Sequence, residues 1–243
     1  MTTYRDPSPV GTAIVTGASR GFGRSVAVQL AQREWNLVVD ARTSTDLDRA
    51  VAEFGALGAG RVRSLAGDIT DPAHARGLVE AAAEIGGLSL LVNNAGILGP
   101  SPQPRLADYP LDILEEVLAV YVIAPLRLVQ LALPRLRDNA GTVINVTSDA
   151  AVEAYEGWGG YGSAKAALEQ MSRVLSVEEP DVTVYWLDPG DMRTRMHQEA
   201  FPGEDIGDRP LPETRAPAVL RLLDEAPPSG RYTVEQILEP AVR

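Results

Sequence analysis

Apolar residues along the chain follow two periods. Short runs rich in β-branched residues, typical of buried strands, alternate with longer Ala-, Leu- and Glu-rich segments that are typical of helices. The runs predict strands at residues 12–16, 36–41, 61–66, 88–92, 142–147 and 182–187. The segments between them predict helices near residues 22–34, 45–57, 72–86, 106–137 and 160–178. This α/β alternation predicts a parallel sheet with helices on both faces, which binds ligands outside the carboxyl ends of its strands.

No repeat, low-complexity tract or linker divides the chain. Its length of 243 residues suits one α/β domain, which we expect to span residues 1–243. Proline and glycine become dense from Phe201 to Pro217. This density predicts a flap near residues 195–212 rather than a domain boundary.

Charge and composition narrow the class of protein. A net charge of −11 and an isoelectric point near 4.7, with no basic cluster, argue against a nucleic-acid surface and favour a small-molecule partner. The chain has no cysteine, and its two histidines, His74 and His197, are too far apart in sequence to suggest a metal site. We find no export signal and no uninterrupted run of about 18 apolar residues, so we expect a cytoplasmic protein outside the membrane.

A glycine-rich loop, TGASRGFG at residues 16–23, joins the first predicted strand to the first predicted helix. Gly17, Gly21 and Gly23 would let the backbone approach a pyrophosphate, and the helix N-terminus would supply free N–H groups. The spacing differs from the G-x-G-x-x-G fingerprint, and glycine turns before helices are common. The loop therefore predicts a phosphate-binding turn, with a purely structural turn as the alternative.

Lys165 is the only lysine among the chain's 22 basic residues, and it lies four positions after Tyr161. On a helix this spacing puts both side chains on one face. A nearby ammonium would lower the pKa of Tyr161 from its ordinary value of about 10, so that the phenol could exchange a proton with a substrate near neutral pH. Ser148, at the end of the predicted strand 142–147, could donate a hydrogen bond to the same substrate oxygen, or could simply form a turn before Asp149.

These motifs resemble those of the short-chain dehydrogenase/reductase family. The matching segments follow the family's order across residues 12–194: TGASRGFG, Asp68 in GDITD, Asn93-Asn94-Ala95-Gly96, Ser148, Tyr161 with Lys165, and Pro189-Gly190 with Thr194. The stretch EGWGGYGSAKAAL, with Trp158 three residues before Tyr161, resembles carbonyl reductases of the sepiapterin and benzil reductase group.

The resemblance implies a single-domain Rossmann-type fold, a doubly wound parallel sheet, which binds a nicotinamide cofactor and exchanges a hydride with a carbonyl or alcohol carbon. Tyr161 would be the proton donor or acceptor, Lys165 would lower its pKa and hold the nicotinamide ribose, and Ser148 would polarise the substrate carbonyl. The residues expected to bind the cofactor are Gly17, Ser19, Arg20, Gly21, Phe22, Gly23, Arg42, Asp68, Ile69, Asn94, Ala95, Gly96, Tyr161, Lys165, Pro189, Gly190, Met192 and Thr194.

Some of these residues have a second interpretation. In the family's terms Asn93 would shape the sheet end near the cofactor, Asp68 would meet the adenine edge, and Thr194 would touch the carboxamide. From the residues alone, Asn93 and Asn94 could instead form a turn, and Asp68 could cap the helix that starts near Pro72.

Tyr121 departs from the family pattern. Similar enzymes carry Asn-Val-x-Gly-Pro in the long helix after the fourth strand, and the stretch here is Tyr121-Val122-Ile123-Ala124-Pro125. The family's asparagine is taken to fix a water that links the lysine to solvent. Three interpretations stay open: Tyr121 is a catalytic residue with a different relay through its hydroxyl, it points elsewhere and the relay is slower, or the protein binds cofactor without much turnover.

The end of the second predicted strand bears on the choice of cofactor. An acidic residue at the strand tip takes the ribose 2′-OH of NAD, whereas arginine takes the 2′-phosphate of NADP. Arg42 follows the strand, and Arg20 lies in the glycine loop. Asp40 falls one place before the usual position of the acid, so strand alternation should turn it from the ribose. We therefore expect NADP(H), with NAD(H) as the alternative.

The substrate side of the cleft is expected to comprise the segment after Gly96, the loop 150–160 and the flap. Few fixed charges occur there, which favours an apolar or aromatic carbonyl compound or alcohol. The expected lining residues are Ile97, Leu98, Tyr155, Trp158, Met196 and Phe201. His197 could contact the substrate, although a solvated loop position is the stronger expectation.

The resemblance also implies a homodimer or homotetramer formed by the helices at 106–137 and 160–178. Two other functions stay open. One is a lyase, isomerase or cyclase that uses the Tyr–Lys pair for proton transfer without net redox change. The other is a non-catalytic regulator that binds the cofactor.

Overall fold

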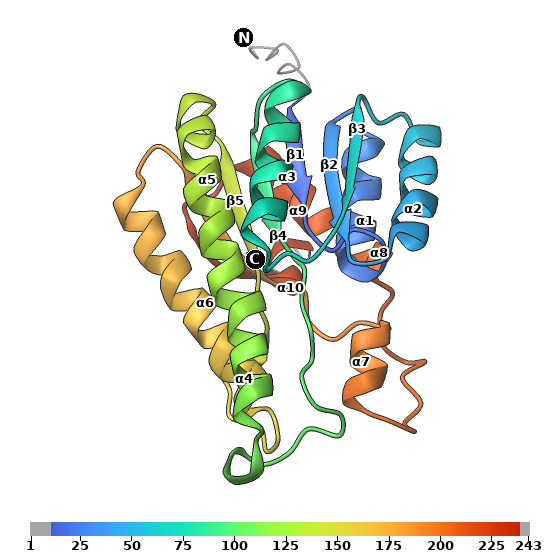
Figure 1. The fold of residues 1–243 in the computed structure, drawn as a ribbon, viewed down its shortest axis with the longest axis vertical. Coiled ribbons are helices and arrows are strands. Elements are labelled where there is room, and N and C mark those ends of the chain that lie inside the picture. The colour runs from blue at the N-terminus through green and yellow to red at the C-terminus, as the bar shows by residue number, and fades with distance from the viewer. Residues whose placement is uncertain (1–10, 239–243) are drawn as a thin grey trace, which may run out of the picture.

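In the part of the chain that the structure describes, seven parallel strands form one sheet at the centre of the molecule (Figure 1). The computed structural model describes residues 11–238. The strand order is β3-β2-β1-β4-β5-β6-β7, so the direction of winding reverses between β1 and β4, as in doubly wound nucleotide-binding sheets. The strands are β1 (Thr12–Val15), β2 (Asn36–Ala41), β3 (Val62–Ala66), β4 (Leu90–Asn93), β5 (Thr142–Val146), β6 (Thr183–Asp188) and β7 (Gly230–Thr233).

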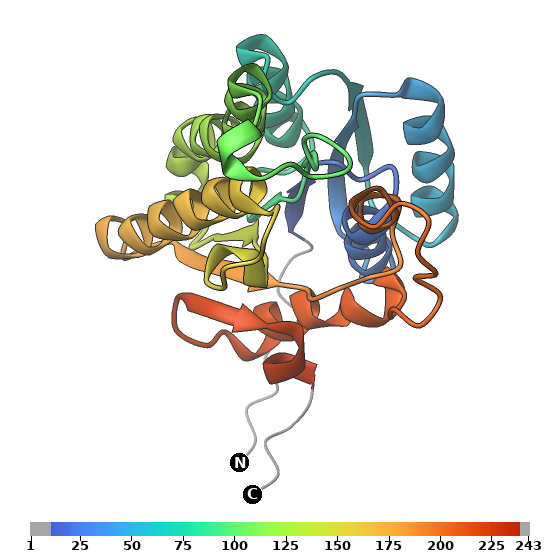
Figure 2. The ribbon, with the colours of Figure 1, turned by 90° about the horizontal axis from the view of Figure 1, so that it is seen from below.

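Helices cover both faces of the sheet (Figure 2). One face packs against α1, α2 and α9, and the other against α3, α5 and α6. This layering confirms the predicted α/β class. The helices are α1 (Gly21–Ala31), α2 (Ser44–Ala56), α3 (Pro72–Glu84), α4 (Leu111–Leu118), α5 (Ala124–Asp138), α6 (Gly159–Glu178), α7 (Arg195–Ala200), α8 (Pro212–Arg215), α9 (Pro217–Glu225) and α10 (Val234–Leu238).

The predicted strands agree with β1 to β6 to within about two residues at each end. The prediction missed β7 and the four short helices after α6, whose segments are interrupted by proline and glycine. The helix α7 lies inside the region expected to be an irregular flap. In Figure 1, α4 and α7 extend below the carboxyl edge of the sheet on opposite sides.

The helix predicted at 106–137 is divided in the structure. A 3₁₀ turn (Leu106–Asp108) precedes α4, and a π-helical turn (Ala119–Ile123) separates α4 from α5. Pro125 has no N–H to donate to the carbonyl of Tyr121, four residues earlier, so the regular ladder is broken at this point. The π turn contains Tyr121, which is buried.

The continuous helical stretch Leu111–Asp138, 28 residues with a mean hydropathy of 1.8 in its most apolar window, is long and apolar enough to span a membrane. In this fold it contacts α3 and α6 instead. Core helices of globular proteins pass the same test of length and composition, so the expectation of a protein outside the membrane stays a prediction.

Candidate active site

A cavity of about 1470 Å³ opens along the carboxyl ends of the strands. Its walls come from the segments that follow β1 to β6, the site that a doubly wound sheet offers to a dinucleotide. All four residues predicted to be catalytic line it, as do all the predicted cofactor-binding residues except Gly23.

The glycine loop adopts a conformation that requires glycine. Gly17 and Gly21 have φ angles of 66° and 57°, in the left-handed region. A Cβ on Gly23 would lie 2.7 Å from the Gly17 carbonyl oxygen and would overlap the Asn94 amide, so Gly23 allows α1 to approach the sheet closely instead of lining the cavity. The geometry leaves the N-terminus of α1 open to a pyrophosphate.

Asn94 ties this loop to the end of β4. Its side-chain amide donates to the Thr16 carbonyl at 2.8 Å, and its backbone N–H donates to the Thr16 hydroxyl at 2.9 Å. Ala95 donates to the same hydroxyl at 3.0 Å. Asn93 takes a different role, donating from its buried side chain to Asn145 on β5 at 2.8 Å. Both asparagines therefore brace the floor of the cavity.

Asp40, at the end of β2, lines the cavity, but its carboxylate is already bonded to protein groups. Its carboxylate accepts the Gly17 N–H at 2.7 Å and lies 3.1 Å from His74 Nε2, and the residue is 2% exposed. Arg20 and Arg42 are exposed and line the cavity. The tip of β2 thus presents an arginine rather than a free acid.

Asp68, in the segment after β3, lines the cavity and is exposed. Hydrogen bonds from the Thr70 N–H and hydroxyl, at 2.8 and 2.7 Å, lower its pKa, and the charge of Arg42 lowers it further. The cap of α3 is Asp71 and not Asp68, because the Asp71 carboxylate accepts the Ala73 N–H at 2.8 Å.

Thr194 lies at the other end of the predicted cofactor site. Its hydroxyl caps α7 by accepting the His197 N–H at 3.1 Å. Pro189, Gly190 and Met192 line the cavity before it.

Ser148, Tyr161 and Lys165 meet at the end of β5. Ser148 Oγ donates to Asp149 Oδ1 at 2.9 Å and accepts the Ala150 N–H at 3.2 Å. A Cβ on Gly162 would lie 2.6 Å from the Ala150 carbonyl oxygen, so glycine lets α6 approach this turn closely. The helix then presents Tyr161 beside the serine.

Lys165 is almost completely buried, with 3% exposure. Its Nζ donates to the Val146 carbonyl at 2.6 Å and lies 5.5 Å from the centre of the Tyr161 ring. The two side chains are on one face of α6, as their spacing predicts. Burial lowers the pKa of Lys165 to about 7, against the opposing charges of Asp188 and Glu169.

The pKa of Tyr161 differs from the prediction. Burial raises it well above its ordinary value, the neighbouring hydroxyls of Ser148 and Tyr121 partly offset this rise, and the charges of Asp188 and Asp149 add to it. The sequence predicted a lowered pKa because it assumed a charged ammonium close to the phenol. In the structure, desolvation is the largest effect on the pKa of Tyr161, and the Lys165 ammonium donates to the Val146 carbonyl.

Tyr121 is buried at the π turn, and its hydroxyl donates to the Ile97 carbonyl at 2.7 Å. Its ring lies 4.0 Å from Lys165 Nζ and packs edge-on against the Tyr161 ring, with centroids 5.4 Å apart. A Cβ on Gly96 would overlap the phenol, so glycine there makes room for the large side chain. Burial raises the pKa of Tyr121 well above its ordinary value.

An aromatic wall leads from the candidate catalytic tyrosine to α7. Trp158 contacts Tyr161 with ring centroids 5.6 Å apart and Phe201 with centroids 5.9 Å apart. Phe201 in turn lies 4.9 Å from the His197 ring. All the side chains expected to line the substrate side do line the cavity.

Two expectations about the substrate side are wrong. His197 is 9% exposed rather than solvated, because it packs under Phe201 with Nδ1 3.7 Å from Asp191. Fixed charges are also more numerous than expected, since Asp149, Asp191 and Arg193 line the same cavity. The sequence could not indicate this, because the residues come from two separate turns, one after β5 and one after β6.

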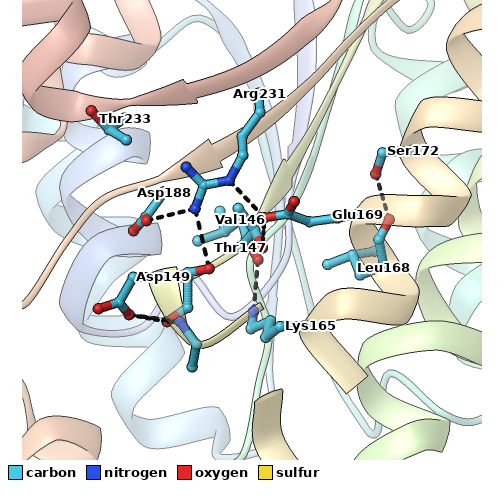
Figure 3. Close-up of polar contacts among 12 residues, drawn as sticks. Val146, Thr147, Asp149, Lys165, Leu168, Glu169, Ser172, Asp188, Arg231 and Thr233 are labelled. Atoms are coloured by element: carbon cyan, nitrogen blue, oxygen red, sulfur yellow. Dashed lines mark hydrogen bonds and ion pairs between the residues drawn. The ribbon is translucent and has the colours of Figure 1, made fainter. Parts of the chain in front are cut away.

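Sequence reasoning missed a polar cluster behind the active site. Arg231 on β7 donates to Glu169 on α6, to Asp188 at the end of β6 and to the carbonyl of Ser148 (Figure 3). Glu169 also accepts the Thr147 hydroxyl at 2.8 Å. The one available signal was the position of Glu169, a helical turn after Lys165. Among residues 11–238, no three His, Asp or Glu side chains are grouped to hold a metal ion.

Comparisons with known proteins agree with this geometry. A family model described as short chain dehydrogenase matches residues 11–205. The chain is 36% identical over 200 residues to a sepiapterin reductase from Meriones unguiculatus, covering 77% of this chain and 76% of that protein. It is 28% identical over 261 residues to the (S)-benzoin-forming benzil reductase of Bacillus subtilis, covering 93% and 98%.

Solved structures give the same result. An alcohol dehydrogenase from the archaeon Thermococcus sibiricus, complexed with 5-hydroxy-NADP, is similar with a TM-score of 0.83 and 26% identity, covering 92% of this chain and 95% of that chain. Fold, cavity and matches together define a nicotinamide-dependent oxidoreductase. The chain belongs to the short-chain dehydrogenase/reductase family.

Proposed function

We propose that this protein is an NADP-dependent carbonyl reductase with Tyr161 as acid and base, assisted by Lys165 and Ser148. The observation that supports it best is that these three side chains line the same cavity as the glycine loop. A dinucleotide bound on α1 would therefore end beside the Tyr161 hydroxyl. The cofactor would supply the hydride, and the protein would supply the proton.

The protonation state of Tyr161 suits reduction. Because burial raises its pKa, the phenol holds its proton at neutral pH and can donate it to the oxygen of a carbonyl as that oxygen gains negative charge. Ser148 Oγ would turn from Asp149 to donate a second hydrogen bond to this oxygen. Lys165 would hold the nicotinamide ribose, and the Tyr121 ring would cover the Lys165 ammonium from the side of α4.

The cofactor preference rests on charge at the tip of β2. Arg20 and Arg42 are exposed on the cavity and can bind a 2′-phosphate, whereas the Asp40 carboxylate is already occupied by Gly17 and His74. The similar Thermococcus sibiricus enzyme is complexed with 5-hydroxy-NADP. Both points favour NADP(H) over NAD(H).

The aromatic wall formed by Trp158, Phe201 and His197 favours an aromatic carbonyl compound as substrate. Sepiapterin and benzil, named in the similar reductases, are compounds of this kind. Both are therefore suitable probes, and neither is assigned as the physiological substrate.

We further propose a homodimer or homotetramer formed by the helical stretches at 106–137 and 160–178, which comprise α4, α5 and α6. Ile123, Val174 and Val177 are 50, 43 and 79% exposed on or beside these helices, which an apolar subunit interface would explain. Two further expectations stay predictions: that the chain is a single domain with a flap at 195–212, and that the protein is located in the cytoplasm.

Turnover of benzil or sepiapterin with NADPH tests the proposal, followed by the absorbance of the reduced nicotinamide. Tyr161→Phe should lower kcat by about 10²- to 10⁴-fold, because the proton donor is lost, while NADPH binding is retained. Tyr232→Phe, which removes an exposed hydroxyl bonded to the Pro228 carbonyl, is the matched control.

Two results would contradict the proposal. Conversion of a carbonyl probe with no change in nicotinamide absorbance would indicate a lyase, isomerase or cyclase. Tight NADPH binding with no turnover of any carbonyl in a broad panel would indicate a cofactor-binding regulator.

A further inference from the structure

The guanidinium of Arg231 joins three segments of the candidate active site from behind (Figure 3). Its Nε donates to Glu169 Oε1 at 2.9 Å, and its Nη2 donates to Asp188 Oδ2 at 2.9 Å and to the Ser148 carbonyl at 3.3 Å. The partners belong to α6, to the end of β6 and to the turn after β5. A planar guanidinium presents its donors on separate nitrogens in fixed directions, whereas an ammonium carries three rotatable donors on a single nitrogen.

Each partner leads directly to a group that the proposed chemistry uses. Ser148 is the residue predicted to donate a hydrogen bond to the substrate carbonyl. Glu169 follows Lys165 by one helical turn and also accepts the Thr147 hydroxyl at 2.8 Å. Asp188 accepts the Gly190 N–H at 2.9 Å and so holds the turn that lines the cofactor side of the cavity.

Charge around the Tyr161–Lys165 pair depends on the same arginine. Glu169 and Asp188 are 3 and 6% exposed, and both raise the pKa of Lys165. Asp188, together with Asp149 on the turn after β5, also raises the pKa of Tyr161, while the hydroxyls of Ser148 and Tyr121 lower it. Arg231 is the cation that contacts both buried carboxylates.

We propose that Arg231 is a positioning residue for carbonyl reduction, which fixes Ser148, the Asp188–Gly190 turn and α6 relative to one another. The inference rests on the proposed function, since it concerns the efficiency of that reaction. Arg231 itself does not line the cavity, so its effect on turnover acts through its three partners.

Three substitutions separate geometry from charge. Arg231→Lys keeps the positive charge but cannot bridge all three acceptors, so kcat for benzil reduction should fall about 10-fold with an unchanged pH profile. Arg231→Met removes both the positive charge and the hydrogen bonds, so kcat for benzil reduction should fall by about 10- to 100-fold. In the reverse reaction, the pH at which the rate of benzoin oxidation rises should become higher. The double variant Arg231→Met with Asp188→Asn restores the balance of charge. Its pH profile should therefore match that of the unaltered protein, while its kcat stays low.

The control is Arg33→Met, which breaks an exposed ion pair with Asp224 at 2.6 Å, and neither of these residues lines the cavity. NADPH affinity and thermal midpoint are measured for every variant. If Arg231→Met does not fold, the lysine variant and the double variant still decide the question, because both retain charge balance.

The outcomes distinguish the two proposals. If the unaltered protein shows no NADPH-dependent reduction of benzil or sepiapterin, the proposed function fails. Suppose instead that the unaltered protein is active and that both Arg231→Lys and Arg231→Met fold. If these variants keep the kcat of the unaltered protein, Arg231 does not position the site. A loss confined to the thermal midpoint, with kcat and the pH profile unchanged, would likewise overturn the inference.

Discussion

The Lys165 ammonium lies closer to the ring of Tyr121 than to that of Tyr161, with centroid distances of 4.0 and 5.5 Å. Lys165 also donates to the Val146 carbonyl, so its contacts in this structure differ from the simple Lys–Tyr pair that the sequence suggests. The Tyr121 ring therefore contacts both Lys165 and Tyr161, while its hydroxyl donates to the Ile97 carbonyl and also partly offsets the raised pKa of Tyr161.

Replacement of Tyr121 tests which part of the side chain matters. Tyr121→Phe keeps the cation–π contact and should retain kcat to within about threefold. Tyr121→Asn removes the ring, whose cation–π contact contributes about 2 kcal/mol or more when desolvated, and should lower kcat by about 30-fold. The measurement is steady-state reduction of benzil by NADPH. Unchanged turnover in Tyr121→Asn would show that the position is idle.

The buried lysine predicts a dependence of stability on pH. Its pKa falls from 10.5 to about 7 on folding, so between these values the unfolded chain binds a proton that the folded protein does not. The free energy of unfolding should therefore rise with pH above 7, by up to about 1.4 kcal/mol per pH unit. Below pH 7 both states bind the proton and this contribution to the slope vanishes.

Urea unfolding of the cofactor-free protein between pH 7 and pH 9.5 measures this slope. Lys165→Met should flatten it, because the titrating group is gone and the methylene chain is largely kept. The tyrosines act with the opposite sign, but only near pH 10 and above, where unfolded tyrosine ionises. An unchanged slope in Lys165→Met would show that another group causes it.

The sequence predicted the parts of the site that depend on local spacing. Tyr161 and Lys165 share a face of α6 because they are four residues apart. The glycine loop follows β1 as expected, and two of its glycines have positive φ angles. Local periodicity is sufficient for such features.

The parts that the sequence did not predict depend on contacts between distant segments. The pKa of Tyr161 is raised because Tyr121 and α6 exclude water, and burial cannot be judged from spacing alone. Arg231 reaches Asp188, 43 positions earlier in the chain, and only the pairing of β7 with β6 brings them together. The burial of His197 likewise requires the packing of Phe201 over it.

Arg42 should determine the choice between the two cofactors. Arg42→Ala removes the cation at the tip of β2, so KM for NADPH should rise by about 10-fold or more while KM for NADH changes little. The two KM values are measured with one carbonyl probe at saturating concentration. Arg49→Ala is the control, because Arg49 is an exposed arginine on α2 that pairs weakly with Asp46 at 3.7 Å. Equal changes for both cofactors would mean that Arg42 does not read the 2′-phosphate.

Phe201 should contribute to selectivity for aromatic substrates. Its ring contacts both Trp158 and His197, so a flat substrate entering beside Tyr161 would meet an aromatic surface that continues onto α7. Phe201→Leu keeps most of the apolar volume but loses the stacking contribution of about 1 kcal/mol, so kcat/KM for benzil should fall by about fivefold. For a short aliphatic ketone, which cannot stack, kcat/KM should stay within about twofold. The ratio of the two kcat/KM values measures the effect, and parallel losses for both ketones would indicate a general disturbance of α7 rather than aromatic recognition.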